Sequence, residues 1–128
     1  MEPLNIPSTR NTPAVICDPI RARFSVAGSS IPENASAFYE PIIKWLNTHM
    51  EEIPTKTEFA FNLPYFNSSS LKAIHLLLME IKRGVDRGKQ FTLTWHMEED
   101  DDFMSEAGET FREMVGMDIT ITTEEFAA

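Results

Sequence analysis

The chain has 128 residues, which is enough for one domain with a hydrophobic core and too few for two comfortable ones. Hydrophobic residues make up 42% and charged residues 24%, which excludes a disordered protein. The net charge of −9 argues against nucleic acid and anionic membrane surfaces as partners, because both need Lys and Arg to neutralise phosphate.

The sequence gives no sign of secretion or membrane insertion. Cys17 is the only cysteine, so no internal disulfide can form and nothing indicates an oxidising compartment. Residues 1–13 are polar and contain proline, without an apolar signal core. No window approaches the roughly 20 apolar residues of a membrane span. We therefore expect a cytoplasmic protein with neither a membrane nor a nucleic acid as partner.

The N-terminal half is predicted to contain extended segments followed by one helix. The extended segments are an arm over residues 1–13 and two strands over 14–18 and 21–27. The two strands are expected to pair as a β-hairpin. A turn-rich loop then precedes a helix that reaches about Ile53 and has Pro41 either in its first turn or at a kink.

The C-terminal half is predicted to alternate between strands and helices. Phe59, Phe61 and Leu63 recur with a period of two, which indicates a half-buried strand. Leu71 and Ile74 begin a helical apolar pattern. The helix is expected to end at about Arg83 or Val85, where Gly84 and Gly88 supply C-terminal signals. The remaining elements are expected to be a strand over 91–95, a helix from about Phe103 to Val115 and a strand over 119–122.

The predicted strands have one apolar face and one polar or small-residue face. A doubly wound sheet, buried on both sides, would show continuous apolar runs instead. The fold class is therefore α/β (α+β), with a mixed sheet of about five strands and about three helices mainly on one face. The other face of the sheet is expected to be bare and is a plausible contact surface.

Three consecutive serines, Ser68 to Ser70, lie where the strand pattern ends and the helical pattern begins. A hydroxyl at this junction suits a helix N-cap, because it can accept from the free N–H groups of the first turn. The same junction also favours a phosphate, because the N–H groups and the helix dipole attract anions. The residues alone leave two interpretations open. Either one serine caps the helix and the others are ordinary loop residues, or the cluster is a regulatory phosphorylation site.

No catalytic arrangement is evident. The three histidines, His49, His75 and His96, are far apart in the sequence, and there is no phosphate-binding glycine loop. The acidic run 98–102 lacks the spacing of a calcium loop, and its carboxylates favour the start of the following helix. We expect no enzyme, cofactor or metal. A metal-assisted enzyme using residues 98–109 remains an alternative, and so does a recognition surface for a basic partner.

Four segments carry motifs that are modest individually and specific jointly. They are Asn11 to Val15, Gly28 to Asn34, Tyr65 to Lys72, and Trp95 to Glu109 with its acidic-Met-x-Glu-x-Gly-Glu pattern. Together and in this order they resemble the SiaC family of bacterial regulatory phosphoproteins over nearly the whole chain. The resemblance implies a fold similar to the STAS domain of anti-sigma-factor antagonists, and one regulatory domain over residues 1–128.

The resemblance also implies a partner-switching function. Members of the family are toggled by a dedicated serine/threonine kinase and a phosphatase, and the unphosphorylated form engages an effector. The best-known effector is a diguanylate cyclase, so the implied pathway is cyclic di-GMP signalling in biofilm control. A plain scaffold whose serines are never modified is the alternative.

The family's phosphoacceptor is the hydroxyl residue directly after the Asn of the Asn-Thr/Ser-Ser block. In this sequence that residue is Ser68, with Ser69 as the rival. Loops that follow parallel strands tend to emerge along one edge of a sheet, so the segments 28–34 and 65–72 are expected to lie side by side. The residues expected to contact partners are Tyr65, Asn67, Lys72, Pro32, Glu33 and Asn34.

Overall fold

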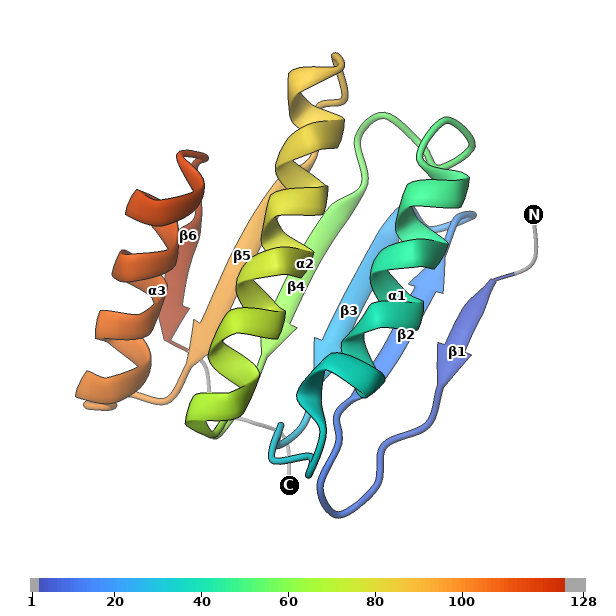
Figure 1. Ribbon diagram of the computed structural model, residues 1–128. Coiled ribbons are helices and arrows are strands. Elements are labelled where there is room, and N and C mark those ends of the chain that lie inside the picture. The colour runs from blue at the N-terminus through green and yellow to red at the C-terminus, as the bar shows by residue number, and fades with distance from the viewer. Residues whose placement is uncertain (1–2, 124–128) are drawn as a thin grey trace.

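The computed structural model describes residues 3–123 and consists of a six-stranded sheet with three helices on one face (Figure 1). The first two residues of the expected arm and residues 124–128 lie outside the described residues. The strands are β1 (Leu4–Ile6), β2 (Ala14–Asp18), β3 (Arg23–Ala27), β4 (Glu58–Asn62), β5 (Thr92–Met97) and β6 (Thr120–Thr123). The helices are α1 (Ala35–His49), α2 (Ser68–Asp86) and α3 (Asp102–Val115).

The strands follow one another in the sheet in chain order. β1, β2 and β3 pair antiparallel, whereas β3, β4, β5 and β6 pair parallel, so the prediction of a mixed sheet is confirmed. The sheet has one strand more than the expected five, because residues 4–6 of the arm pair with β2 along its edge. Three residues are too few to show a period-two pattern, which is why the sequence did not reveal this strand.

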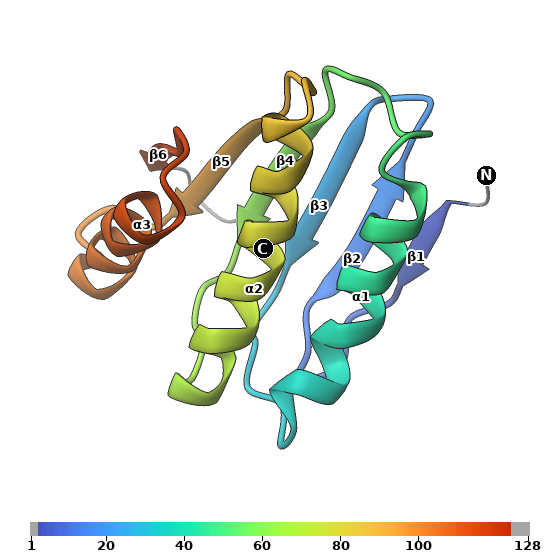
Figure 2. The same ribbon diagram turned by 45° about the horizontal axis from the view of Figure 1, so that its top comes forward.

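The helices cover one face of the sheet, and the core lies between these two layers (Figure 2). Phe24, Phe59, Phe61 and Trp95 are fully buried on the face that the helices cover. The Trp95 indole Nε1 donates a hydrogen bond to the carbonyl of Met104 at 2.9 Å, which joins β5 to the first turn of α3. The expected one-sided arrangement follows from the alternation of apolar and polar residues along these strands.

Helix α1 begins before Pro41, which is one of the two starts that the sequence left open, and it ends earlier than the predicted Ile53. The Asn34 side chain accepts from the N–H of Ala37 at 3.1 Å and caps the helix, which therefore starts at Ala35. Pro41 is exposed and lies inside the helix. The helix ends at His49, where the N–H of Glu52 donates to the carbonyl of His49 at 2.9 Å and closes a tighter three-residue turn.

Two helical glycines permit close packing. Gly84 lies inside α2 and does not end it, and a Cβ there would collide with the ring of Phe91. Gly108 lies in α3, where a Cβ would be 2.8 Å from Cδ1 of Trp95 and 3.0 Å from Cδ1 of Ile121. The glycine of the acidic-Met-x-Glu-x-Gly-Glu motif therefore allows α3 to approach the sheet closely.

Candidate functional site

Two loops meet at the carboxyl ends of the central strands β3 and β4. The loop after β3 leads into α1, and the loop after β4 leads into α2 (Figure 1). The N–H of Ser30 donates to the carbonyl of Tyr65 at 2.9 Å, and the N–H of Asn67 donates to the carbonyl of Ser30 at 3.1 Å. The expectation that segments 28–34 and 65–72 lie side by side is confirmed.

Asn67 caps helix α2, and Ser68 is the first residue of the helix. The Asn67 Oδ1 atom accepts from the N–H of Ser70 at 3.1 Å and from the hydroxyl of Ser69 at 2.9 Å. The prediction that a serine caps this helix is therefore wrong. Asparagine and serine are equally good caps, and the backbone here brings the asparagine to the cap position.

The three serines occupy different environments. Ser70 is fully buried, and its Oγ lies 3.0 Å from the carbonyl oxygen of Ser30 and 2.9 Å from Asn67 Oδ1. Ser69 is exposed, but its hydroxyl is bonded to Asn67. Ser68 is exposed, and its hydroxyl makes no hydrogen bond within residues 3–123. Only Ser68 combines exposure with an uncommitted hydroxyl among these serines.

A buried chain of hydroxyls extends from the junction into α1. The Ser30 Oγ lies 3.0 Å from the Ser70 Oγ and 2.7 Å from the phenol oxygen of Tyr39. Burial raises the pKa of Tyr39 to about 12, although the hydrogen bond with Ser30 acts in the opposite direction. Tyr39 is therefore neutral at physiological pH, and an uncharged network joins α1, the loop after β3 and α2.

Sequence reasoning missed this network. Tyr39 is fully buried in α1, whereas the more apolar Phe38 beside it is only partly buried. Ser30 was part of a turn-rich loop and carried no signal of burial. The available clue was the helical spacing of Tyr39 from Ile42 and Leu46, which share its buried face.

The first turn of α2 is suited to hold an anion on Ser68. The N–H groups of Ser68 and Ser69 make no hydrogen bond within the described residues. The positive end of the helix dipole lies at the same place. Lys72 is exposed four residues later, a spacing that allows its ammonium group to approach a phosphate on Ser68.

The capping role makes Asn67→Ala the damaging substitution at this junction. It removes the acceptor for three donors, so the free energy of unfolding is expected to fall by about 2 kcal/mol. Ser68→Ala is the matched control and is expected to change the free energy of unfolding by less than about 0.5 kcal/mol, because its hydroxyl has no partner. Urea denaturation of both variants measures the difference. A larger loss for Ser68→Ala than for Asn67→Ala would contradict the assigned cap.

A model of the family described as SiaC family regulatory phosphoprotein matches residues 6–124. This chain belongs to the SiaC family. A curated but uncharacterized protein of Pseudomonas aeruginosa (strain UCBPP-PA14) is 32% identical over 113 residues, which cover 88% of this chain and 90% of that protein.

Solved structures of SiaC from Pseudomonas aeruginosa share this fold. One has a TM-score of 0.85 at 30% identity and covers 97% of this chain and 100% of its own. Apo-SiaC has a TM-score of 0.82 at 31% identity, covering 95% and 99%. A crystal structure of the diguanylate cyclase SiaD in complex with its activator SiaC matches at a TM-score of 0.84 and 30% identity, covering 94% and 99%.

The SiaC family motifs divide into structural and exposed residues. Asn67 and Asn34 cap α2 and α1, and Pro32 is buried, so the described role of these three residues is structural. The exposed residues of the expected contact set are Tyr65, Lys72, Glu33 and Asn34, the last of which also caps α1.

The acidic run of the family motif begins helix α3. Asp101 caps the helix by accepting from the N–H of Met104 at 3.1 Å, and Asp102 lies in the first turn. The interpretation that these carboxylates favour the helix start is confirmed for both residues. Residues 3–123 contain no group of three or more His, Cys, Asp or Glu side chains placed to hold a metal ion.

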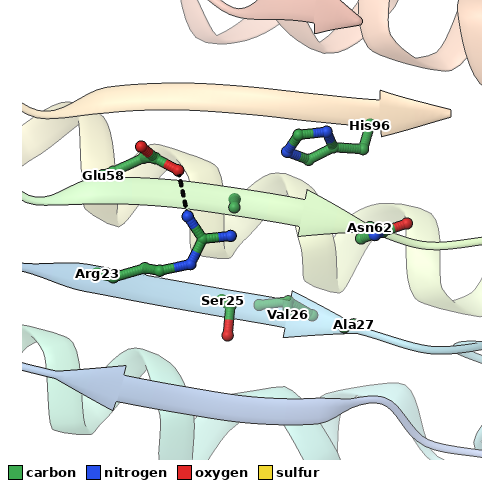
Figure 3. A pocket seen from close by; sticks show the side chains of 8 residues that line it. Arg23, Ser25, Val26, Ala27, Glu58, Asn62 and His96 are labelled. Atoms are coloured by element: carbon green, nitrogen blue, oxygen red, sulfur yellow. Dashed lines mark hydrogen bonds and ion pairs between the residues drawn. The ribbon is translucent and has the colours of Figure 1, made fainter. Parts of the chain in front are cut away.

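The uncovered face of the sheet contains a polar hollow of about 360 Å³ (Figure 3). Arg23 on β3 forms an ion pair with Glu58 on β4, with 2.5 Å between the guanidinium nitrogen and the carboxylate oxygen. His96 on β5 and Asn62 on β4 lie towards the other end of the hollow. Since Arg23 and Glu58 neutralise each other, the hollow has no strong preference for an anion or a cation.

No helix in the described part of the chain combines the length and apolar character that crossing a membrane requires.

Proposed function

We propose that this protein is a phosphorylation-controlled partner-switching regulator. In its unphosphorylated form it binds and activates a diguanylate cyclase in cyclic di-GMP signalling that controls biofilm formation. A cognate serine/threonine kinase phosphorylates it, and a cognate phosphatase restores it, in the cytoplasm. The observation that carries the proposal is the exposed, uncommitted hydroxyl of Ser68 directly after Asn67 in a SiaC family protein.

Ser68 is the proposed phosphoacceptor, and Ser69 is the fallback. A kinase must bring the acceptor oxygen into line with the γ-phosphate, which requires an accessible hydroxyl. Ser68 meets this requirement without breaking a hydrogen bond, whereas Ser69 must first break the hydrogen bond from its hydroxyl to Asn67 Oδ1. Ser70 would require the first turn of α2 to open, because its side chain is fully buried.

The proposed effector is inferred from the relative, for which the cyclase complex is known. In Pseudomonas aeruginosa, SiaC is the activator of the diguanylate cyclase SiaD. The similarity covers nearly all of both chains, so the same kind of partner is the best-supported one here. The residues proposed to contact partners in general are the exposed Tyr65, Lys72, Glu33 and Asn34, with Asn67 and Pro32 shaping the two loops.

Phosphopeptide mapping tests the acceptor. The wild-type protein, Ser68→Ala and Ser69→Ala are each incubated with ATP and the candidate kinase from the same genome, and then analysed by intact mass and tandem mass spectrometry. The wild-type protein and Ser69→Ala are expected to carry one phosphate on Ser68, and Ser68→Ala none. Full modification of Ser68→Ala at an unrelated residue would overturn the assignment. A wild-type protein that no candidate kinase modifies would favour the scaffold.

A further inference from the structure

Two large aromatic side chains are exposed beside the phosphoacceptor loop. Tyr65 is 53% exposed and Phe103 is 54% exposed. Their rings stack with centroids 6.4 Å apart and planes 26° apart. Tyr65 precedes α2 and Phe103 lies in the first turn of α3, and these two helices begin along the same edge of the sheet (Figure 1). Paired aromatics of this exposure are typical of a protein contact surface.

The exposed aromatic pair packs on core residues through Phe103. The Phe66 ring is buried, and its centroid lies 5.4 Å from that of Phe103. Phe66 in turn packs against Trp95 and Phe111, with centroids 6.2 and 6.3 Å away. Because this packing fixes Phe103 before any partner arrives, a partner loses little entropy in ordering the aromatic pair.

The acidic run lies directly ahead of Phe103. It consists of the five carboxylates Glu98, Glu99, Asp100, Asp101 and Asp102. None of the five forms an ion pair within residues 3–123. The start of α3 accounts for Asp101, which caps the helix, and for Asp102 in its first turn. The side chains of Glu98, Glu99 and Asp100 make no hydrogen bond or ion pair among the described residues. The surface at the starts of α2 and α3 therefore combines the rings of Tyr65 and Phe103 with carboxylates that no cation pairs among the described residues.

We propose that Tyr65, Phe103 and the acidic run form the docking surface for the phosphatase, which presents an apolar side chain flanked by Lys or Arg. This inference rests on the proposed function and specifies which partner uses this surface. The aromatic rings supply the apolar contact, and the carboxylates attract and orient a basic partner. The protein's net charge of −9 acts in the same direction.

The sign of the charge favours the phosphatase over the kinase and the cyclase as the partner at this surface. A phosphate on Ser68 adds a charge of about −1.5 to −2 to a surface that is already negative. A basic partner then binds the phosphorylated form more tightly. The phosphatase must bind the phosphorylated form, because that form is its substrate. The cyclase must dissociate from the phosphorylated form, and the kinase must release it as its product. An enzyme that hydrolyses a phosphate ester also needs metal ions or arginine at the phosphate oxygens.

Steady-state dephosphorylation tests the inference. The substrate is the full-length protein phosphorylated on Ser68, and the enzyme is the candidate phosphatase from the same genome. Phe103→Ala and the double reversal Glu98→Lys with Glu99→Lys are expected to raise KM about tenfold while kcat changes little. The effect of the double reversal is expected to shrink as the ionic strength rises.

Matched controls lie at the other end of the same helix. Met114 is 56% exposed, and Glu113 is an exposed carboxylate beside it. Met114→Ala and Glu113→Lys are expected to leave KM within about twofold of the wild type, since both changes are remote from the aromatic pair. Thermal melts of all variants separate loss of contact from loss of fold.

Affinities for the cyclase, measured by calorimetry with the unphosphorylated variants, complete the test. Unchanged cyclase affinity together with raised phosphatase KM supports the inference. Unchanged phosphatase KM, or a loss confined to cyclase or kinase binding, overturns it and leaves the proposed function intact. A wild-type protein that neither accepts phosphate on Ser68 nor binds the cyclase overturns the proposed function itself.

Discussion

Ser70→Asp is expected to lower the free energy of unfolding by roughly 3 kcal/mol or more, whereas Ser68→Asp is expected to leave it nearly unchanged. The Ser70 side chain is fully buried, and its hydrogen-bond partners are the hydroxyl and carbonyl of Ser30 and the side-chain oxygen of Asn67. These groups carry no positive charge that a carboxylate could pair with. An unpaired charge in such a position costs roughly 3 kcal/mol or more, against a total stability of about 5–15 kcal/mol for a domain.

The same carboxylate at Ser68 lies on the surface at the positive end of α2. It is expected to be neutral or to stabilise the protein by about 0.3–1 kcal/mol, and the melting temperature should stay within a few degrees of wild type. Urea denaturation of the two variants measures the contrast, with Ser70→Ala and Ser68→Ala as uncharged controls. Equal stability of Ser68→Asp and Ser70→Asp would show that the two serines do not differ in burial as described.

The arrangement of the sheet was predictable because it follows from residue patterns within single strands. Phe59 and Phe61 alternate with smaller or polar residues, and the same rule holds in Thr92–Met97. This alternation indicated one covered face, and the order of strands and helices indicated a mixed sheet. Strand β1 was not predicted, because only residues 4–6 pair and such a short segment shows no pattern of its own. It is defined by its hydrogen bonds to β2.

The details of the site depended on contacts between distant residues. Asn67 and the serines are equally suitable caps in the sequence, and the parallel bridge between Ser30 and Phe66 fixes where the helix begins. The bonds that commit Ser70 to Ser30 cross forty positions of the chain. The choice of Ser68 came from the resemblance to the SiaC family, and its exposure and free hydroxyl now support that choice.

Phosphorylation of Ser68 is expected to lower the affinity for the cyclase by about 80-fold, or near 2.6 kcal/mol. This factor changes the occupancy of the complex from roughly 90% to 10% at a fixed partner concentration. The fold itself tolerates the phosphate, because the free N–H groups of α2 and Lys72 stabilise an anion there. The loss must therefore arise at the interface, where the partner has to desolvate a dianion on a surface it contacts.

Calorimetry with the cyclase is the decisive measurement, using the wild-type protein before and after treatment with the kinase. Treatment of Ser68→Ala with the same kinase is the control and is expected to leave the cyclase affinity unchanged. Ser68→Asp, which carries one charge and lacks the tetrahedral oxygens, should lose less affinity than the phosphorylated protein. Equal affinities for both forms of the wild type would mean that the cyclase does not contact the start of α2. The release would then require a change in fold, which the tolerance of this helix for an anion argues against.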